Sequence, residues 1–256
     1  MNIAITRAPG PRLGECELTW MERAPIDPVR AVAEHLEYER QLAAHGWTIV
    51  RAEEAPDLPD AVFVEDAAVV LDEIAIITRP GAESRRAELR GIMRALTPYR
   101  SLRAIDPPAT LDGGDVLRLG RTLHVGVGGR TNAAGASRLR DLTEPLGYTV
   151  VETRFSGCLH LKTAATSIGG GRVLLNPACV DPRAFDAESV EIDPGEPSGA
   201  NALLLDERTL LLPASAPRTR ARLEALRVRV VPIDIAELEK AEAGVTCCSI
   251  LIRSTR

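Results

Sequence analysis

The feature that most constrains this chain is a recurring pattern of short apolar runs and amphipathic stretches. Each unit has two runs of strand length, then a helical stretch and a further strand. The unit spans roughly 45 to 55 residues and occurs about five times. The units share little sequence identity, so only the pattern repeats. Such units can close radially and place one loop from each around a central site. The pattern therefore predicts an α/β fold, with residues 1–256 as a single domain.

One helix is well marked. Asp27 can cap it, Pro28 suits its first turn, residues 29–45 form its body, and Gly46 ends it. The predicted strands are 1–7, 47–50, 62–71, 74–78, 116–119, 122–127, 148–151, 163–167, 173–175, 202–205, 209–212, 229–233 and 249–252. Helical stretches are predicted at 83–96, 132–144 and 217–226, with short turns near Arg183 and Glu237.

Composition excludes several classes of protein. A net charge of -5 and a pI near 5.5 argue against a nucleic-acid partner. No apolar stretch approaches the roughly 20 residues that span a bilayer, so no membrane association is expected. The five cysteines are odd in number, form no CxxC pair and include two neighbours, which argues against a disulfide framework or a zinc knuckle. We expect a reduced, cytoplasmic compartment.

Acidic residues surround the apolar run at 61–64. Asp60 precedes it, and Glu65 and Asp66 follow it. Neighbouring residues of a strand face opposite sides, so only one of the last pair should face the core unless a bulge intervenes. Buried carboxylates need a cationic partner or ligand. The alternative is a strand edge with solvated acids.

Three further junctions combine polar residues with apolar strands. Asp112 opens an Asp-Gly-Gly-Asp segment, which is also ordinary turn chemistry. His160 lies between leucines and could be a hydrogen-bonded core residue, and Cys247 could be a structural thiol. Each begins a different unit, so a radial fold would bring them together. A cysteine, a histidine and carboxylates in one place suit thiolate chemistry with a histidine acid/base.

Two arginines lie where turns enter helices. Arg85 precedes one predicted helical stretch and Arg130 another. The helix macrodipole disfavours a cation there, whereas the guanidinium fork suits the capture of a carboxylate. The alternative for each is a solvated surface arginine.

Taken together, these stretches resemble the dimethylarginine dimethylaminohydrolase family of the guanidine-modifying (pentein) superfamily. The resemblance covers essentially the whole chain in the right order. No single motif is specific, but the ordered set is. The matching segments are 58–66, 76–86, 109–116, 130–132, 160–162, 238–240 and 246–249.

The resemblance implies a five-bladed, pseudo-symmetric α/β propeller (the pentein fold) and a role for each matching residue. Cys247, which follows Thr246 as the family nucleophile follows Ser or Thr, would be the nucleophile in preference to Cys248. His160 would be the general acid/base, and Asp112 would orient it. The expected substrate contacts are Glu65 and Asp66 for the guanidinium, Asp60 and the Leu18 carbonyl for the α-ammonium, Arg85 and Arg130 for the α-carboxylate, and the backbone carbonyl near Ala241.

The implied reaction is hydrolysis of N-methylated arginines to citrulline and methylamine or dimethylamine through a Cys-thiouronium intermediate. It implies no metal and no organic cofactor, although zinc bound adventitiously to the Cys/His pair would inhibit. The expected partner is a small guanidino amino acid, and the expected state is a monomer or homodimer. The alternatives are an arginine deiminase, whose usual helical insertion has no room here, an amidinotransferase, and a catalytically silent guanidine-binding module.

Two stretches depart from the family pattern. Glu242 and Ala243 stand where the family carries Asp-Gly, and the longer acid and extra methyl are expected to alter the pocket beside the guanidinium. Residues 15–20, where a lid over the site is expected, are also distinctive, and Trp20 could add contacts of its own.

Overall fold

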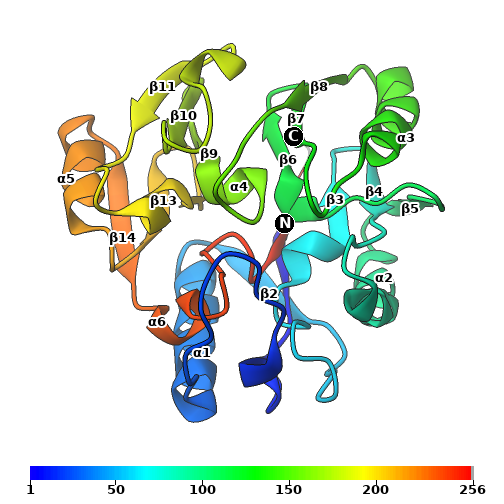
Figure 1. The fold of residues 1–256 in the computed structure, drawn as a ribbon, viewed down its shortest axis with the longest axis horizontal. Helices are drawn as coiled ribbons and strands as arrows, with labels where there is room; N and C mark the ends of the chain where they lie inside the picture. Colours follow the sequence, from blue (N-terminus) through cyan, green and yellow to red (C-terminus); the bar gives the residue numbers. More distant parts are fainter. Residues whose placement is uncertain (255–256) are drawn as a thin grey trace.

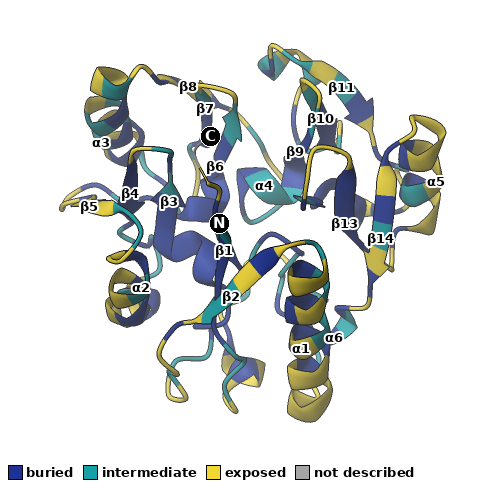
Figure 2. Cartoon of the chain, turned by 180° about the vertical axis from the view of Figure 1, so that it is seen from behind, coloured by how far each residue is buried: buried dark blue, intermediate teal, exposed yellow. Residues whose placement is uncertain are grey.

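Five three-stranded β-sheets surround a common axis in the computed structural model, which describes residues 1–254 (Figure 1). The longer helices lie at the periphery of this ring. Figure 2 shows exposed residues on the outward faces of the peripheral helices and buried strands near the axis. This arrangement confirms the α/β class and the five-bladed propeller. No helix within residues 1–254 combines the length and the apolar character that crossing a membrane requires.

The five sheets share one topology. In each, the first strand pairs antiparallel with the middle strand, and the middle strand pairs parallel with the third. A short turn suffices for an antiparallel pair, whereas a parallel pair needs a longer crossover. From first to third strand, the sheets are β3 (Ala68–Val70), β4 (Ile74–Ile77), β5 (Ser101–Ala104); β6 (Val116–Leu119), β7 (Thr122–Gly126), β8 (Thr149–Thr153); β9 (Ala165–Gly169), β10 (Arg172–Leu175), β11 (Glu188–Glu191); β12 (Leu203–Leu204), β13 (Thr209–Pro213), β14 (Arg229–Ile233); and β15 (Ile250–Ile252), β1 (Asn2–Thr6), β2 (Trp47–Arg51).

Helices form four of the five parallel crossovers. Asp27 caps the first of them as predicted, because its side chain accepts hydrogen bonds from the amides of Val29 and Arg30. Only a 3-10 turn at Pro182–Ala184 lies between β10 and β11. The crossover helices are α1 (Pro28–Ala44), the 3-10 helix Glu83–Glu88 continued by α2 (Leu89–Leu96), α3 (Ala133–Thr143) and α5 (Pro217–Ala225). Two one-turn helices, α4 (Leu161–Ala164) and α6 (Ala236–Glu239), complete the set that concerns the site.

The strand predicted at 62–71 is wrong in its first half. Val64–Ala67 forms a 3-10 turn, and only Ala68–Val70 is a strand. Likewise, the strand predicted at 163–167 begins at Ala165, because α4 occupies the preceding residues. The third strands β5 and β11 were not predicted. Most of their residues are exposed, and apolar residues are not consecutive in them, so these strands lack the apolar run that marks a buried strand.

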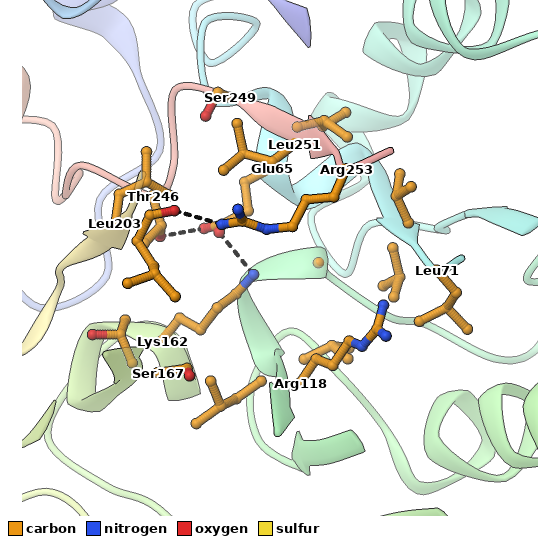
Figure 3. Close-up of a pocket in the computed structure, with 18 of the residues that line it drawn as sticks. Glu65, Leu71, Arg118, Lys162, Ser167, Leu203, Thr246, Ser249, Leu251 and Arg253 are labelled. Carbon is orange, nitrogen blue, oxygen red and sulfur yellow. Dashed lines mark hydrogen bonds and ion pairs between the residues drawn. The ribbon is translucent and has the colours of Figure 1, made fainter. Parts of the chain in front are cut away.

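The first strands of the five sheets line the axis of the ring. Among them, β6 contacts β9, β9 contacts β12, and β3 contacts β15, and residues of all five strands line a cavity of about 480 Å³ (Figure 3). Segments that carry predicted site residues directly precede four of these strands: residues 65–66, 112, 160 and 247. The fold therefore gathers loops that are far apart in sequence at one end of the central strands.

Candidate active site

Glu65 and Asp66 are both buried, contrary to the expectation that only one would face the interior. The reason is the 3-10 turn at Val64–Ala67, since neighbouring side chains of a tight helix do not alternate across a sheet. Glu65 Oε1 forms an ion pair with Lys162 Nζ at 2.7 Å, and Oε2 accepts a hydrogen bond from Thr246 Oγ1 at 2.7 Å. Figure 3 shows Glu65 held between these two side chains.

The Glu65–Lys162 pair separates two regions of the ring. Glu65, Lys162 and Thr246 line the axial cavity, whereas Cys247, His160 and Asp112 do not. Lys162 and Thr246 were not predicted as site residues. The sequence placed each next to a predicted catalytic residue, but gave no sign that they share one carboxylate across the ring.

Asp66 lies between two cationic groups. Its Oδ2 pairs with Arg85 Nη1 at 2.6 Å, and its Oδ1 lies 3.8 Å from His160 Nε2 and accepts a hydrogen bond from the Gly114 amide at 2.9 Å. Burial alone would raise the pKa of Asp66, but the charges of His160 and Arg85 outweigh it and hold that pKa well below its usual range. Asp66 is therefore ionised at neutral pH.

The two glycines after Asp112 let the backbone approach Glu65, Asp66 and His160 closely. A Cβ on Gly113 would lie 2.0 Å from the Glu65 carbonyl oxygen. A Cβ on Gly114 would lie 2.7 Å from Asp66 Oδ1 and 2.8 Å from the His160 ring. All three distances are shorter than heavy atoms tolerate, so the segment needs glycine at both positions.

His160 and Asp112 form the central hydrogen bond of the site. His160 Nε2 lies 3.0 Å from Asp112 Oδ2, and both side chains are buried. The other carboxylate oxygen of Asp112 accepts a hydrogen bond from the Gly81 amide at 2.9 Å. Asp112 is thus fixed at both oxygens and can orient the imidazole.

Asp115 binds the backbone directly after His160. Its Oδ1 accepts a hydrogen bond from the Leu161 amide at 3.0 Å, and its Oδ2 accepts one from Thr131 Oγ1 at 2.6 Å. Burial raises the pKa of Asp115 to about 6. The sequence placed Asp115 in the same motif as Asp112 but indicated no link to His160.

The surrounding acids hold a proton on His160. Burial lowers the pKa of this imidazole, but the charges of Asp66 and Asp115 and the hydrogen bond to Asp112 outweigh it and raise the pKa to about 9. At neutral pH the ring is therefore an imidazolium, which is a proton donor.

Cys247 lies in the turn that follows α6. Its Sγ accepts a hydrogen bond from the Gly244 amide at 3.4 Å, and its carbonyl accepts one from the Glu65 amide at 3.1 Å. Burial, together with Glu65 and Asp66, raises the pKa of its thiol well above the ordinary value. The resting thiol is therefore neutral, and a cation beside it would favour the thiolate. Cys248, by contrast, packs within the apolar core.

The remaining predicted contacts border the segment of residues 17–21. Both oxygens of buried Asp60 lie 3.2 Å from the Glu17 amide and accept its hydrogen bond, and burial raises the pKa of Asp60. Leu18 is partly buried and packs on the same apolar cluster as Ala241 and Cys247. The Trp20 side chain, in contrast, is 60% exposed.

The two predicted carboxylate receptors differ in their bonding. Arg85 is buried and donates to Asp66, to both oxygens of Glu88, and to the carbonyls of Asp60 and Phe63. These bonds occupy Nε, Nη2 and one N–H of Nη1, so at most one of its five donors is left for a ligand. Arg130 Nη1, however, is buried and has no hydrogen-bond partner within residues 1–254.

Asp66, Asp112 and His160 are close enough to consider as a metal site. One ligand atom of each lies within 4.8 Å of the others. A metal needs the neutral imidazole, whereas these carboxylates favour the protonated ring. The donor set suits an imidazolium between two carboxylates better than a metal ion.

No protein-family model matches the chain. A dimethylarginine dimethylaminohydrolase of Streptomyces coelicolor is 45% identical over 251 residues, covering 98% of this chain and 96% of the relative. The dimethylarginine dimethylaminohydrolase of Pseudomonas aeruginosa is 33% identical over 249 residues, covering 96% of this chain and 97% of the relative.

Solved structures of dimethylarginine dimethylaminohydrolases are also similar to this chain. A cysteine-to-serine variant of the Pseudomonas aeruginosa enzyme in complex with citrulline has a TM-score of 0.92 at 31% identity, covering 97% of this chain and 98% of that one. A histidine-to-glycine variant of a dimethylarginine dimethylaminohydrolase, as an adduct with S-methyl-L-thiocitrulline, has a TM-score of 0.92 at 31% identity and covers 98% and 100% of the two chains. The N-terminal domain of the arginine dihydrolase ArgZ, at 18% identity and a TM-score of 0.87, shares the fold and covers 98% of both chains.

Proposed function

This chain belongs to the dimethylarginine dimethylaminohydrolase family, and from that membership we propose that it hydrolyses N-methylated arginines to citrulline and methylamine or dimethylamine. The observation that carries the proposal is the buried His160 imidazolium, held between Asp112 and Asp66 beside the turn of Cys247. A thiol, a proton donor and acids that suit a cation are the groups that guanidinium hydrolysis needs.

Substrate binding uses the acids for the guanidinium and the outer residues for the amino-acid end. Asp66 and Glu65 retain lone pairs beyond their present partners and would orient the guanidinium against Cys247. The α-ammonium would bind the Asp60 carboxylate and the Leu18 carbonyl, and the Ala241 carbonyl would border the substrate. The α-carboxylate would bind mainly Arg130, whose Nη1 lacks a partner within residues 1–254, with one N–H from Arg85.

In the first half of the reaction, the bound cation favours loss of the Cys247 proton to solvent. The thiolate then attacks the central guanidinium carbon, forming the carbon–sulfur bond and a neutral tetrahedral species. His160 donates its proton to the methylated nitrogen, the carbon–nitrogen bond breaks, and the amine departs. A thiouronium on Cys247 and a neutral His160 remain.

In the second half, neutral His160 accepts a proton from water as the oxygen attacks the thiouronium carbon. The carbon–sulfur bond then breaks, and the hydroxyl proton passes to the sulfur. Citrulline leaves, Cys247 is again a thiol, and His160 is again protonated. Asp112 keeps the ring aligned through both proton transfers.

A substrate panel tests this proposal. Arginine, monomethylarginine, and asymmetric and symmetric dimethylarginine are each incubated with the enzyme, and citrulline and amine are measured. We expect citrulline from monomethylarginine and asymmetric dimethylarginine, with loss of turnover in Cys247→Ser. Conversion of arginine with release of ammonia, without turnover of methylated arginines, would instead identify a deiminase. Unchanged turnover in the serine variant would contradict the role of Cys247.

The compartment and assembly are part of the same proposal. The five cysteines are all free thiols, which supports a reduced, cytoplasmic environment. The expectation of a monomer or homodimer stays a prediction.

A further inference from the structure

Three consecutive backbone amides point at one carboxylate. The amide of Thr19 donates to both oxygens of Glu242 at 3.0 Å, and those of Trp20 and Met21 donate to Oε1, the latter at 2.5 Å. Successive amides that converge in this way form an anion-binding nest. The Glu242 carboxylate thus takes the place of a bound anion within the segment of residues 17–21, hereafter the covering loop.

The backbone of Glu242 indicates that this contact is maintained at a cost. Its φ angle is 58°, in the left-handed region that residues other than glycine and asparagine seldom adopt. A side chain in that conformation persists where surrounding contacts hold it, and such positions gather at functional sites. Hydrogen bonds to a carboxylate are stronger than neutral ones, so the three amides can offset this strain.

Glu242 connects the covering loop to the nucleophile turn. The residue before it, Ala241, contributes a carbonyl to the proposed substrate site, and two residues after it the Gly244 amide donates to Cys247 Sγ. The carboxylate itself points to the loop amides. The longer acid therefore reaches the loop, and the expectation that Glu242 and Ala243 alter the pocket beside the guanidinium stays a prediction.

The covering loop also contacts two groups that the proposed function assigns to the substrate. Its Glu17 amide donates to Asp60, and its Thr19 hydroxyl lies 3.5 Å from Arg130 Nη2. Leu18, whose carbonyl is the proposed ammonium ligand, lies between these points. The position of this loop therefore controls several contacts with the amino-acid end of the substrate.

We propose that Glu242 is a positioning residue that holds the covering loop closed over the site and thereby places the Leu18 carbonyl. The inference rests on the proposed function and adds a specificity element to it. The contact between the Glu242 carboxylate and the amides of the covering loop, hereafter the latch, acts on the amino-acid end of the substrate and not on the reacting carbon. Its loss should therefore raise KM much more than it lowers kcat.

Hydrogen exchange of the substrate-free protein tests the latch without any turnover. In Glu242→Ala, the amides of Thr19, Trp20 and Met21 should exchange on the order of tenfold faster or more, with the rest of the chain unchanged. Glu242→Gln keeps one acceptor oxygen and should fall between the alanine variant and the parent. Glu22→Gln is the matched control, because Glu22 is an exposed acid next to the loop without a hydrogen bond or ion pair in the described chain. Unchanged exchange in Glu242→Ala overturns the proposal.

Kinetics then test whether the latch positions the substrate. With methylated arginines, Glu242→Ala should raise KM on the order of tenfold and change kcat by less than about threefold. Glu22→Gln should match the parent in both. Faster exchange without a change in KM overturns the positioning role. Absence of turnover in the parent enzyme would instead refute the proposed function, and the exchange result would still decide the latch.

Discussion

At the scale of single residues, the bonding of a charged side chain decides whether it can act on a ligand. Arg85 and Arg130 look alike in the sequence, since each lies where a turn enters a helix. In the structure, Arg85 is committed to the carboxylates of Asp66 and Glu88, while Arg130 keeps a buried nitrogen without a partner in residues 1–254. Their substitutions should therefore affect different quantities.

We expect Arg130→Gln to raise KM for methylated arginines about 10- to 100-fold, because a hydrogen bond to a charged group contributes roughly 1.5–3 kcal/mol. Its melting temperature should stay close to that of the parent. Arg85→Gln should lower the free energy of unfolding by about 3–5 kcal/mol, since it leaves buried carboxylates unpaired. Chemical denaturation and steady-state kinetics measure both effects. A stable Arg85→Gln with a larger rise in KM than Arg130→Gln would reverse the assignment.

The protonation of His160 gives a second prediction at this scale. Its pKa is raised from the ordinary 6.5 to about 9, so folding favours the imidazolium. That stabilisation is fully present below about pH 6.5 and is lost as the pH rises through about 9. In NMR titrations, one of the four histidines should therefore titrate near pH 9, with His160→Gln identifying its signal.

Asp112→Asn should lower the pKa of His160, because it removes the hydrogen-bonded charge. The loss of stability on raising the pH should then still begin near pH 6.5, but it should be complete at lower pH and be smaller in total than in the parent. Asp141→Asn, which changes an exposed acid on α3, is the control and should leave the titration in place. A His160 signal that titrates near pH 6.5 in the parent protein would contradict this account.

At the scale of elements, the tight approach of the 113–115 turn to its neighbours fixes the site. Gly114→Ala would place a methyl group 2.7 Å from Asp66 Oδ1 and 2.8 Å from the His160 ring. Displacement of catalytic groups by about 1 Å costs on the order of 100-fold in rate, so kcat/KM should fall by about that factor. Gly14→Ala is the matched control, because a Cβ there meets nothing within 4 Å. Equal activity of the two variants would show that the turn has room to adjust.

The same scale shows what the sequence could and could not predict. Middle strands such as β4 and β13 were predicted because they are buried apolar runs, and α1 because its cap is local. The third strands β5 and β11, which are largely exposed, gave no such signal. Glu65 and Asp66 were placed in a strand because hydrophobicity alone does not distinguish a strand from a short 3-10 turn.

Of the contacts within the candidate site, some could be predicted from the sequence and others could not. Asp112 and His160 were expected to interact, and they do. The Glu65–Lys162 and Glu242–loop contacts join segments roughly 100 and 220 residues apart, and only the closed ring brings them together. Long-range pairing of polar residues is the information that a single sequence lacks.

At the scale of the whole molecule, the ring closes through its two chain ends. β15, near the C-terminus, pairs antiparallel with β1, near the N-terminus, and the Ser254 amide donates to the Asn2 side chain at 3.1 Å. Unlike the first and middle strands of the other four sheets, β15 and β1 are thus not joined by a short turn. Closure depends on pairing across the full length of the chain, which carries a large loop-closure entropy.

A circular permutant tests this closure. A short Gly/Ser linker can join the neighbouring ends, and the new ends can open the exposed turn at residues 206–208 between β12 and β13. We expect turnover within about threefold of the parent, because all five sheets keep their strands and the opened turn contains no residue of the proposed site. A second permutant has its new chain ends between Gly113 and Gly114 instead. It should lose turnover, since that backbone holds Asp66 beside His160. If the first permutant were unfolded, a connected hairpin there would be needed to form the ring. If the second were active, the site would not depend on the continuity of that turn.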